Sequence, residues 1–517
     1  MTKPISFGEL DFRTVSSLED SHARPGQEKP FRILIMGDFS GRSSADLSSP
    51  DIALRKAAEV DRDNIDEVME RFKVTARLRF DSNEESELVV GFNEMDDFLP
   101  DSLFERLEIF QRLRQTKASL EDPRTFEKAA GQIRSLLSPD TQAEEPMLQE
   151  EKTGRGKPAP EESADLLEKI LDEASPETAQ GISGRDPWSA FLHRIVSPHI
   201  VKQDDIRKQE LTSVVDDAVS SLMRMILHHR EFQAIEAVWR SVHFLVSRLE
   251  TDSHLKVYLL DIAKQELSAD VMKSEDLLSS TLYRILAEQG AGTAGADPWS
   301  VIAGVYTFEN TRYDAGALGR IAKIARLAGA PFISGAHPTI IGCRSLAETP
   351  DSDEWTGTLN EEDRSAWEAL RCIPEASYLG LAMPGFLLRL PYGRETEPCE
   401  RFEFEEMNTQ NEDYLWGNPC LACALLLGQA FSRDGWDMRP GTFLDIDNLP
   451  LHVYLSDGET EVKPCTGVLL TEKAAEVILD NGIMPLVSLK DTDTVRLVRF
   501  QSLCDPPSRL AGRWEQS

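Results

Sequence analysis

The sequence is poor in cysteine and has no long hydrophobic run. Its seven cysteines are scattered over 517 residues, and this number and spacing favour reduced thiols over a disulfide framework. No stretch of about eighteen uncharged apolar residues occurs, as a membrane-spanning helix would need. The N-terminal residues MTKPISFGELDFRTV also lack the apolar core of a signal peptide. These absences predict a cytoplasmic protein without direct membrane insertion.

Basic residues are also in short supply. The chain has 56 Lys and Arg against 89 Asp and Glu, which gives a formal net charge of -33. A negative charge of this size opposes binding to the phosphates of nucleic acid and to anionic lipid surfaces. The composition therefore predicts no nucleic-acid partner.

Motifs for catalysis are missing or stand in the wrong context. The letters GAGTAG at 290–295 match a dinucleotide-binding pattern, but in that pattern the glycines follow a strand and open a helix. Here a predicted helix over 277–289 precedes them and a predicted strand over 301–308 follows, so we interpret the segment as a connector. No G-x-S-x-G turn or comparable nucleophile motif occurs.

One cysteine pair and one histidine pair are the remaining candidates for chemistry. Cys420 and Cys423 form a C-x-x-C motif inside the apolar run NPCLACALLLGQAF. They lack the second pair that a zinc site needs, so we expect buried thiols that behave as small hydrophobes. His228 and His229 are adjacent and therefore diverge on a helix, which is wrong for joint ligation of a metal. We predict no enzyme, no cofactor and no metal site.

The sequence does contain a clear succession of helix and buried strand. Residues 255–262 carry apolar side chains on both faces, as in a strand that is covered on both sides. The preceding segment has apolar residues at intervals of three and four, which is the stripe of an amphipathic helix. That stripe consists of Phe232, Ile235, Val238, Trp239, Val242, Leu245, Val246 and Leu249. The pattern predicts a mixed α/β fold, and the chain length predicts two or three domains.

The predicted helix also carries the most specific motif of the chain. LHHREFQAIEAVWRSVHFLV resembles the signature of the large subunit of the type VI secretion contractile sheath (TssC), with Phe232, Glu236, Trp239 and Arg240 at the expected positions. The motifs LRLPYGRETEPCERFEFEE, YLWGNPCLACALLLGQAF and ILDNGIMPLVSLKDTD follow in the order of that family. Physically, Glu236 and Arg240 have the i,i+4 spacing of a structural ion pair, beside a core tryptophan.

A second resemblance lies nearer the N-terminus. FRILIMG at 31–37 predicts a buried strand, and the turn GDFSGR after it lacks the Gly-Lys-Ser/Thr of a phosphate-binding loop. Asp63 is the expected cap of a helix over 65–72, which two strands and a further helix follow. In order and spacing, residues 31–136 resemble the small subunit of the same sheath (TssB).

The segment between the two resemblances has a different composition. Residues 137–185 are rich in Glu, Pro and Gly, which is typical of a flexible acidic linker. The resemblance implies that a short helix here, residues 163–174, is recognised by a recycling AAA+ unfoldase, while docking on the chain's own body is the other interpretation. The apolar stripe of this helix is Leu166, Leu167, Ile170 and Leu171.

These segments together predict two sheath-type bodies joined by an acidic linker. Residues 1–30 form an N-terminal arm that either lies along its own domain or adds a strand to the sheet of a neighbour. Residues 31–136 form the small-subunit-like domain, and 186–517 form the large-subunit-like domain. In the family the large subunit continues well beyond the motif around Pro485, so we expect this domain to be shortened at its C-terminus.

The resemblance implies a structural subunit that polymerises around an inner tube and contracts to propel it. Its partners would be other sheath protomers, the inner tube protein, baseplate components and the unfoldase. A shortened C-terminus favours an alternative, a sheath-derived accessory such as a cap, a baseplate-proximal adaptor or a regulatory protomer that does not self-polymerise. A third hypothesis is a soluble α/β enzyme with a cleft at its strand ends.

Overall fold

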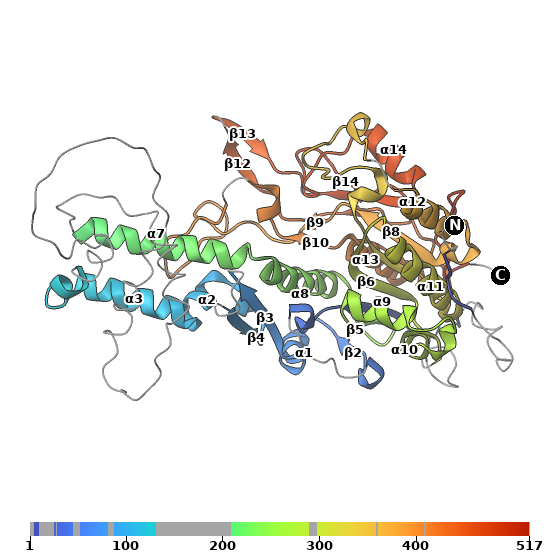
Figure 1. Cartoon of the computed structure of the whole chain (residues 1–517), viewed down its shortest axis with the longest axis horizontal. Helices are drawn as coiled ribbons and strands as arrows, with labels where there is room; N and C mark the ends of the chain where they lie inside the picture. The colour runs from blue at the N-terminus through green and yellow to red at the C-terminus, as the bar shows by residue number, and fades with distance from the viewer. Residues whose placement is uncertain are drawn as a thin grey trace, which may run out of the picture.

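The computed structural model describes residues 5–9, 25–26, 28–44, 52–80, 87–130, 208–288, 297–357, 360–407, 410–456 and 458–515. A sheet with helices on both faces lies at one end of an elongated molecule, and a pair of helices extends away from it (Figure 1). The predicted linker, its helix with Leu166, Leu167, Ile170 and Leu171, and the connector at 290–295 lie outside the described residues.

The helices and strands alternate along most of the described chain. The helices are α1 (Ile65–Phe72), α2 (Pro100–Arg106), α3 (Glu108–Glu121), α7 (Lys208–Leu227), α8 (Arg230–Arg248), α9 (Lys264–Met272), α10 (Thr281–Tyr283), α11 (Arg312–Ala328), α12 (Glu361–Cys372), α13 (Pro419–Asp434) and α14 (Glu472–Asp480). The strands are β1 (Phe31–Gly37), β2 (Ala58–Val60), β3 (Val74–Arg79), β4 (Glu87–Phe92), β5 (Leu255–Asp261), β6 (Val301–Phe308), β7 (Phe332–Ala336), β8 (Leu379–Met383), β9 (Phe386–Leu387), β10 (Trp416–Gly417), β11 (Asp445–Ile446), β12 (Val453–Ser456), β13 (Glu459–Val462), β14 (Ile483–Ser488) and β15 (Val495–Leu497).

The main sheet has nine strands in the order β11-β15-β14-β8-β7-β6-β1-β5-β2. The strands from β14 to β5 in this order run parallel, and β2, β15 and β11 are antiparallel additions at the two edges. Parallel strands joined by helices are buried on both faces, which explains the nearly continuous apolar runs in β1, β5 and β7. The predicted α/β class is confirmed.

Strand β1 lies inside this sheet rather than in a separate body. It pairs in parallel with β5 along its whole length, from Phe31 beside Leu255 to Gly37 beside Asp261, and with β6 on its other side. The sequence predicts two bodies joined by a linker, whereas in the structure the first segment (31–136) supplies β1 and β2 to the sheet of the second segment (186–517). The physical reason is that FRILIMG buries both of its faces, so it needs covering helices as well as strands at both edges.

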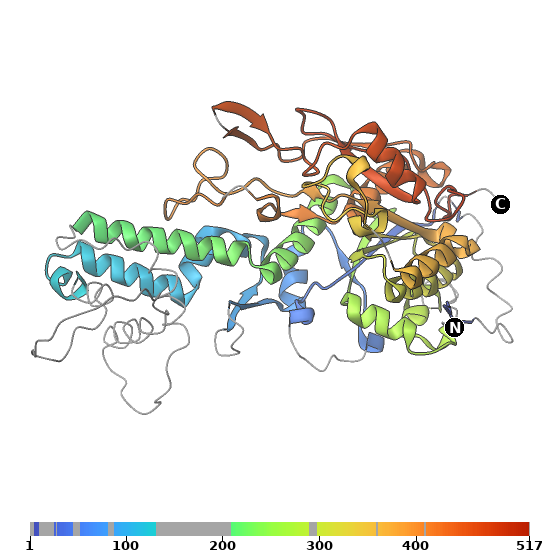
Figure 2. The same ribbon diagram turned by 45° about the horizontal axis from the view of Figure 1, so that its top comes forward.

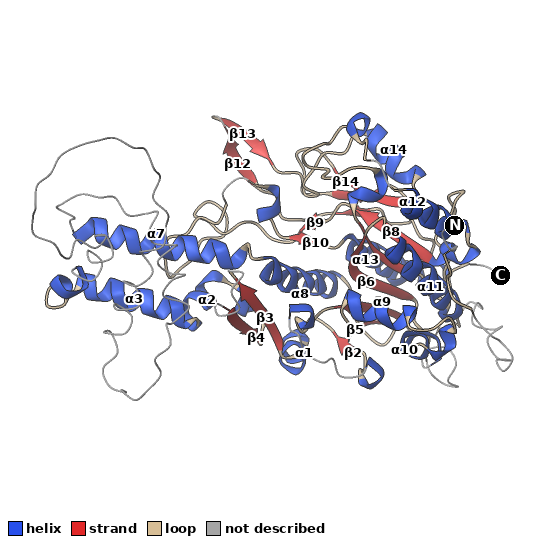
Figure 3. Ribbon diagram, in the orientation of Figure 1, coloured by secondary structure: helices blue, strands red, loops and turns tan. Residues whose placement is uncertain are grey.

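Helices cover the sheet on its two faces (Figure 3). Ile33 and Ile35 of β1 belong to the core beneath α8 and α13, whereas Leu34 and Met36 face the core formed with α9, α11 and α12. This alternation follows from the two-residue period of a strand. The predicted amphipathic helix is confirmed as α8, because all eight residues of its stripe are buried.

Helices α3 and α7 lie side by side and form a helical pair that extends from the sheet (Figure 2). Leu120 of α3 packs against Leu211 and Val215 of α7 in a small separate cluster. The Lys117 ammonium lies 2.5 Å from the Asp216 carboxylate across the same interface. This helical pair therefore combines one helix from segment 31–136 with one helix from segment 186–517.

The described part of the N-terminal arm lies on its own chain. Glu9 forms a parallel bridge with Asp276, and the Lys323 ammonium donates a hydrogen bond to the Gly8 carbonyl at 2.6 Å. The Phe7 ring lies so close to Gly319 that a β-carbon there would come within 2.1 Å of it. Residues 5–9 thus pack on α11 and on the loop after α9.

The sequence predicts Asp63 as the N-terminal cap of α1, and this prediction is wrong. The first residue before the helix is Asn64, and its side chain accepts from the Asp61 N–H rather than from the helix. The Asp61 carboxylate accepts from the N–H groups of Asp63 and Asn64, so the turn closes on Asp61.

Among the described helices, none combines the length and the apolar character that crossing a bilayer requires.

Candidate functional site

The apolar stripe of α8 is covered largely by aromatic residues of the first segment. Trp239 is fully buried, and its indole N–H donates a hydrogen bond of 2.9 Å to the Phe39 carbonyl. Its ring meets those of Phe39 and Phe72 edge to face, at centroid distances of 5.6 and 6.1 Å. One end of the stripe repeats the arrangement, because Phe232 lies edge to face against Phe92 at 5.7 Å. Trp239 and Phe232 therefore join the two segments within one chain.

The polar side of α8 contributes to a buried ionic cluster. Glu236 is fully buried and accepts from the guanidinium of Arg240 at 2.7 Å, which is the i,i+4 pair indicated by the sequence. The same carboxylate accepts from Arg389 Nε at 2.8 Å. Arg389 also donates through both terminal nitrogens to Glu406, at 2.7 and 2.9 Å. Two buried carboxylates and two guanidiniums thus balance each other in charge.

Further hydrogen bonds complete the surroundings of this cluster. The Tyr392 N–H donates to Glu406 at 2.7 Å, and Arg240 donates to the Tyr392 hydroxyl at 2.9 Å. His228 lies at the rim, with Nε2 3.5 Å from Glu406 and Nδ1 3.3 Å from Asp413. The cluster therefore ties α8 to the segment 388–413, which runs between β9 and β10.

The two adjacent histidines point to different partners. His229 places Nε2 3.2 Å from the Arg79 carbonyl, and its Nδ1 accepts from the Glu231 N–H. His228 faces Glu406 instead. They therefore diverge, as adjacent residues at the start of a helix should.

Burial and charge act in opposite directions on the ionised groups of the cluster. Burial alone raises the pKa of Glu406, but the positive charge of Arg389 and hydrogen bonds from His228, Arg389 and the Tyr392 N–H lower this pKa to about 2. Burial lowers the pKa of Arg389, and the charges of Glu236 and Glu406 outweigh it and raise the pKa. Burial raises the pKa of the Tyr392 hydroxyl. The charged forms of Glu406 and Arg389 are therefore the stable ones.

The sequence indicated only half of this cluster. Glu236 and Arg240 were visible from their spacing on one helix, whereas Arg389 and Glu406 lie far away along the chain. A signal was present for Arg389, which stands in the apolar run FLLRLPY, but not for Glu406, because two other glutamates precede it in FEFE. A buried charge without a partner is costly, so such residues call for an opposite charge in space.

The glycine-bearing turn after β1 is closed by the chain's own carboxylate. Asp261, the last residue of β5, accepts from the N–H groups of Phe39 and Ser40 at 2.9 and 3.2 Å. It also accepts from the Ser40 hydroxyl at 2.8 Å and from Arg42 Nε at 2.7 Å. Asp261 thus occupies the donors that a phosphate group would need, in agreement with the rejection of a phosphate-binding loop.

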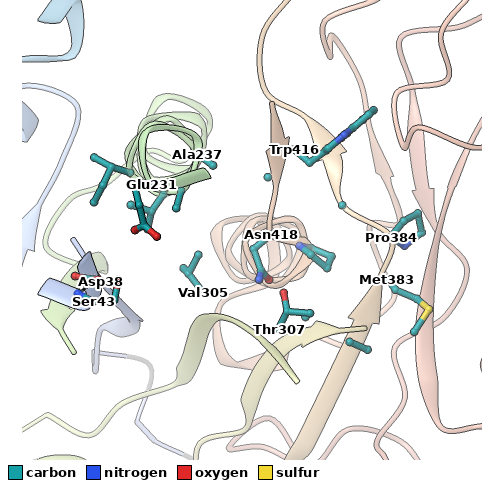
Figure 4. A pocket seen from close by; sticks show the side chains of 18 of the residues that line it. Asp38, Ser43, Glu231, Ala237, Val305, Thr307, Met383, Pro384, Trp416 and Asn418 are labelled. Atoms are coloured by element: carbon teal, nitrogen blue, oxygen red, sulfur yellow. Dashed lines mark hydrogen bonds between the residues drawn. The ribbon is translucent and has the colours of Figure 1, made fainter. Parts of the chain in front are cut away.

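A cavity of about 460 Å³ opens where β1, β6, β7 and β8 end. Figure 4 shows Glu231 and Asp38 on one side of it, and Trp416 and Pro384 on the other. Asp38 already accepts from the N–H groups of Arg42 and Ser43, both at 2.7 Å. The described residues that line the cavity include no Lys, Arg, His or Cys. The ionisable side chains of this lining are the carboxylates of Asp38 and Glu231.

The cysteine pair of α13 lies in the core. Cys420 and Cys423 are fully buried and carry free thiols. Burial raises the pKa of both thiols, that of Cys423 to about 12, so they stay protonated and unreactive near neutral pH. Within the described residues, no group of three or more His, Cys, Asp or Glu is arranged to hold a metal ion.

Two family models match different parts of this chain. Residues 209–504 match the family described as EvpB, tail sheath N-terminal domain (VipB). Residues 17–150 match the family described as type VI secretion system, VipA. The two matches follow each other in sequence, and they correspond to the two resemblances that the motifs indicated.

A relative supports the match over residues 209–504. The chain is 30% identical over 370 residues to the type VI secretion system sheath protein TssC1 of Pseudomonas aeruginosa. The alignment covers 69% of this chain and 74% of that protein. It thus extends over most of both sequences.

Proposed function

This chain belongs to the tail sheath family of type VI secretion systems and joins a VipA-like to a VipB-like segment, and from that premise we propose that it polymerises around an inner tube and contracts to propel it. The observation that carries the proposal is the place of β1. A strand from the small-subunit-like segment lies between two strands of the large-subunit-like segment. One chain therefore supplies both the small-subunit-like and the large-subunit-like part of the proposed protomer.

Fusion of the two segments has a consequence for assembly. It supplies both subunits in equal number and keeps them at the high effective concentration of covalently linked partners. Contacts between copies that repeat head to tail without closing produce a helical filament, which is the geometry of a sheath. Such a protein does mechanical work by exchanging contacts between protomers, and it needs no catalytic residue.

The interior of a sliding protomer has to be stiffer than its contacts with neighbours. The cluster of Glu236, Arg240, Arg389 and Glu406 supports this role, because it locks α8 to Arg389 and Glu406 by ion pairs whose carboxylates are buried. Breaking a buried ion pair costs about 3 to 5 kcal/mol. The cluster thus serves to hold the protomer together while its outer contacts change.

The proposed partners are other sheath protomers, the inner tube protein and baseplate components. A recycling AAA+ unfoldase is a further proposed partner, through the predicted helix at 163–174. Both proposals rest on membership of the family and on the composition of the chain, in which an acidic surface favours protein partners over nucleic acid.

Electron microscopy of the purified full-length chain tests polymerisation. We expect tubes or filaments for the wild type and for Arg364→Met, because Arg364 is half exposed on α12 and makes only a 3.9 Å pair with Glu361. Arg389→Met should reduce tube formation in proportion to its loss of folded protein. Wild-type particles that stay at the size of one chain would refute self-polymerisation and support the sheath-derived accessory instead.

A further inference from the structure

Strands β12 and β13 form a hairpin that projects from the body and pairs with no third strand among the described residues. Figures 1 and 2 both show it standing apart from the main sheet. Its register places Val453 beside Val462 and Leu455 beside Thr460. Because no third described strand pairs with it, the hairpin presents backbone donors and acceptors at two edges. An isolated two-stranded hairpin is only marginally stable in water, so an added strand would stabilise it.

The two faces of the hairpin differ in chemistry. One face carries Val453, Leu455, Thr460 and Val462 and has no charge. Two of its apolar side chains are exposed to solvent, Val453 at 49% and Leu455 at 73%. Large apolar side chains are more often buried. This face is therefore an uncovered apolar surface.

The opposite face is acidic. It carries Glu461, which accepts a hydrogen bond of 3.0 Å from the Tyr454 hydroxyl, and the exposed Glu459 in the same strand. Because successive residues of a strand point to opposite faces, a strand added at either edge would place alternate side chains against the apolar and the acidic face. The complementary sequence alternates apolar with basic residues.

We propose that this hairpin binds an extended segment of a partner protein in which apolar and basic residues alternate. Main-chain hydrogen bonds at the free edge would hold the segment, its apolar side chains would cover Leu455 and Val453, and its basic side chains would pair with Glu459 and Glu461. The site is separate from the ionic cluster and from the cavity at the strand ends.

Charge favours such a partner over a second copy of this chain. A second copy also carries a net charge of -33. The edge strands of its main sheet, β2 and β11, carry Glu59 and Asp445. Neither of these edge strands carries a basic side chain that could pair with Glu459 and Glu461.

Titration calorimetry of the full-length chain with two synthetic peptides tests the proposal. One short peptide alternates valine with lysine, and the other alternates valine with glutamate. We expect the wild type to bind the lysine peptide and not the glutamate peptide. Glu459→Lys/Glu461→Lys should weaken binding by about tenfold or more, because two cross-strand charge pairs become repulsive. Leu455→Ser should weaken it by about fivefold without altering charge.

A matched control separates local pairing from the attraction of a basic peptide to an acidic protein. Glu368→Lys/Glu476→Lys makes the same change in net charge at exposed positions of α12 and α14, and it should bind the lysine peptide as the wild type does. An equal loss in both double variants would overturn the proposal. So would wild-type self-association, measured by sedimentation and abolished by Leu455→Ser, because a second copy would then be the occupant.

Discussion

Replacing Arg389 with methionine removes the centre of the buried ionic cluster. Methionine fills much of the volume of the arginine stem but provides no donor. Glu236 retains Arg240 at 2.7 Å, whereas Glu406 retains only the Tyr392 N–H and the more distant His228. The substitution therefore leaves one carboxylate, almost fully buried, without a permanent positive partner.

The structure allows two estimates of the resulting loss of stability. Removing one partner of a buried ion pair typically costs about 3 to 5 kcal/mol. Independently, the lowering of the Glu406 pKa from 4.5 to about 2 corresponds to about 3 kcal/mol, at about 1.4 kcal/mol for each pKa unit. Both estimates are a large fraction of the stability of an ordinary domain. We expect the free energy of unfolding to fall by about 3 to 5 kcal/mol near neutral pH.

The dependence on pH distinguishes this cause from a packing defect. A carboxyl group whose pKa is lowered by folding stabilises the protein above its ordinary pKa, here 4.5, and this contribution is lost as the pH falls toward the folded value. The wild type should therefore lose stability between about pH 5 and pH 2. Without Arg389, burial becomes the dominant influence and raises the pKa of Glu406, so protonation stabilises the variant as the pH falls. The difference between the two proteins should narrow from pH 7 to pH 5.

Urea unfolding followed by tryptophan fluorescence measures this difference at each pH. Arg364→Met serves as the control, because its guanidinium is 49% exposed and its loss should change stability by less than about 1 kcal/mol. A loss below about 1 kcal/mol for Arg389→Met, or a difference that stays constant with pH, would refute the assignment of a stabilising buried cluster.

Three further predictions concern how the two segments hold together. Trp239→Ala should lower the free energy of unfolding by about 3 to 5 kcal/mol, because it removes a buried ring and its hydrogen bond to Phe39; unchanged thermal unfolding would contradict this. Limited proteolysis should cut first within 137–185, where the acidic, proline-rich composition leaves little to bury, and earliest cuts inside 31–130 would disprove the boundary. Separately expressed fragments 1–140 and 185–517 should be poorly soluble and recover on co-expression, because the second lacks β1 from the centre of its sheet. Two stable fragments that show no mutual binding in calorimetry would refute this.

The elements that were predicted correctly have a strong local period. The stripe of α8 and the two-sided apolar runs of β1 and β5 are visible because burial repeats at 3.6 or 2 residues along the chain. A cap is less secure, since several polar residues compete for it. At α1, Asp61 closes the preceding turn in place of Asp63, and spacing alone does not separate the two.

The features that were missed depend on contacts between distant parts of the chain. The residues of FRILIMG do not indicate that β1 pairs with β5 and β6, because pairing with any two apolar strands would bury it equally well. Likewise, Glu236 meets Arg389 across 153 positions of sequence. Charged residues inside apolar runs indicate that a partner exists, but its identity follows only from the topology of the sheet. The expectation of two separate bodies arose from this gap.

The shared sheet changes how force would pass through the proposed protomer. Strand β1 is in register with seven residues of β5 and four of β6. Its ladder hydrogen bonds on both edges therefore resist a pull along the strand together, and each contributes about 1 kcal/mol net. A load applied to either segment would reach the other through this sheet and through the ion pairs of Arg389. We propose that the predicted linker at 137–185 serves to keep the two segments together until β1 has paired.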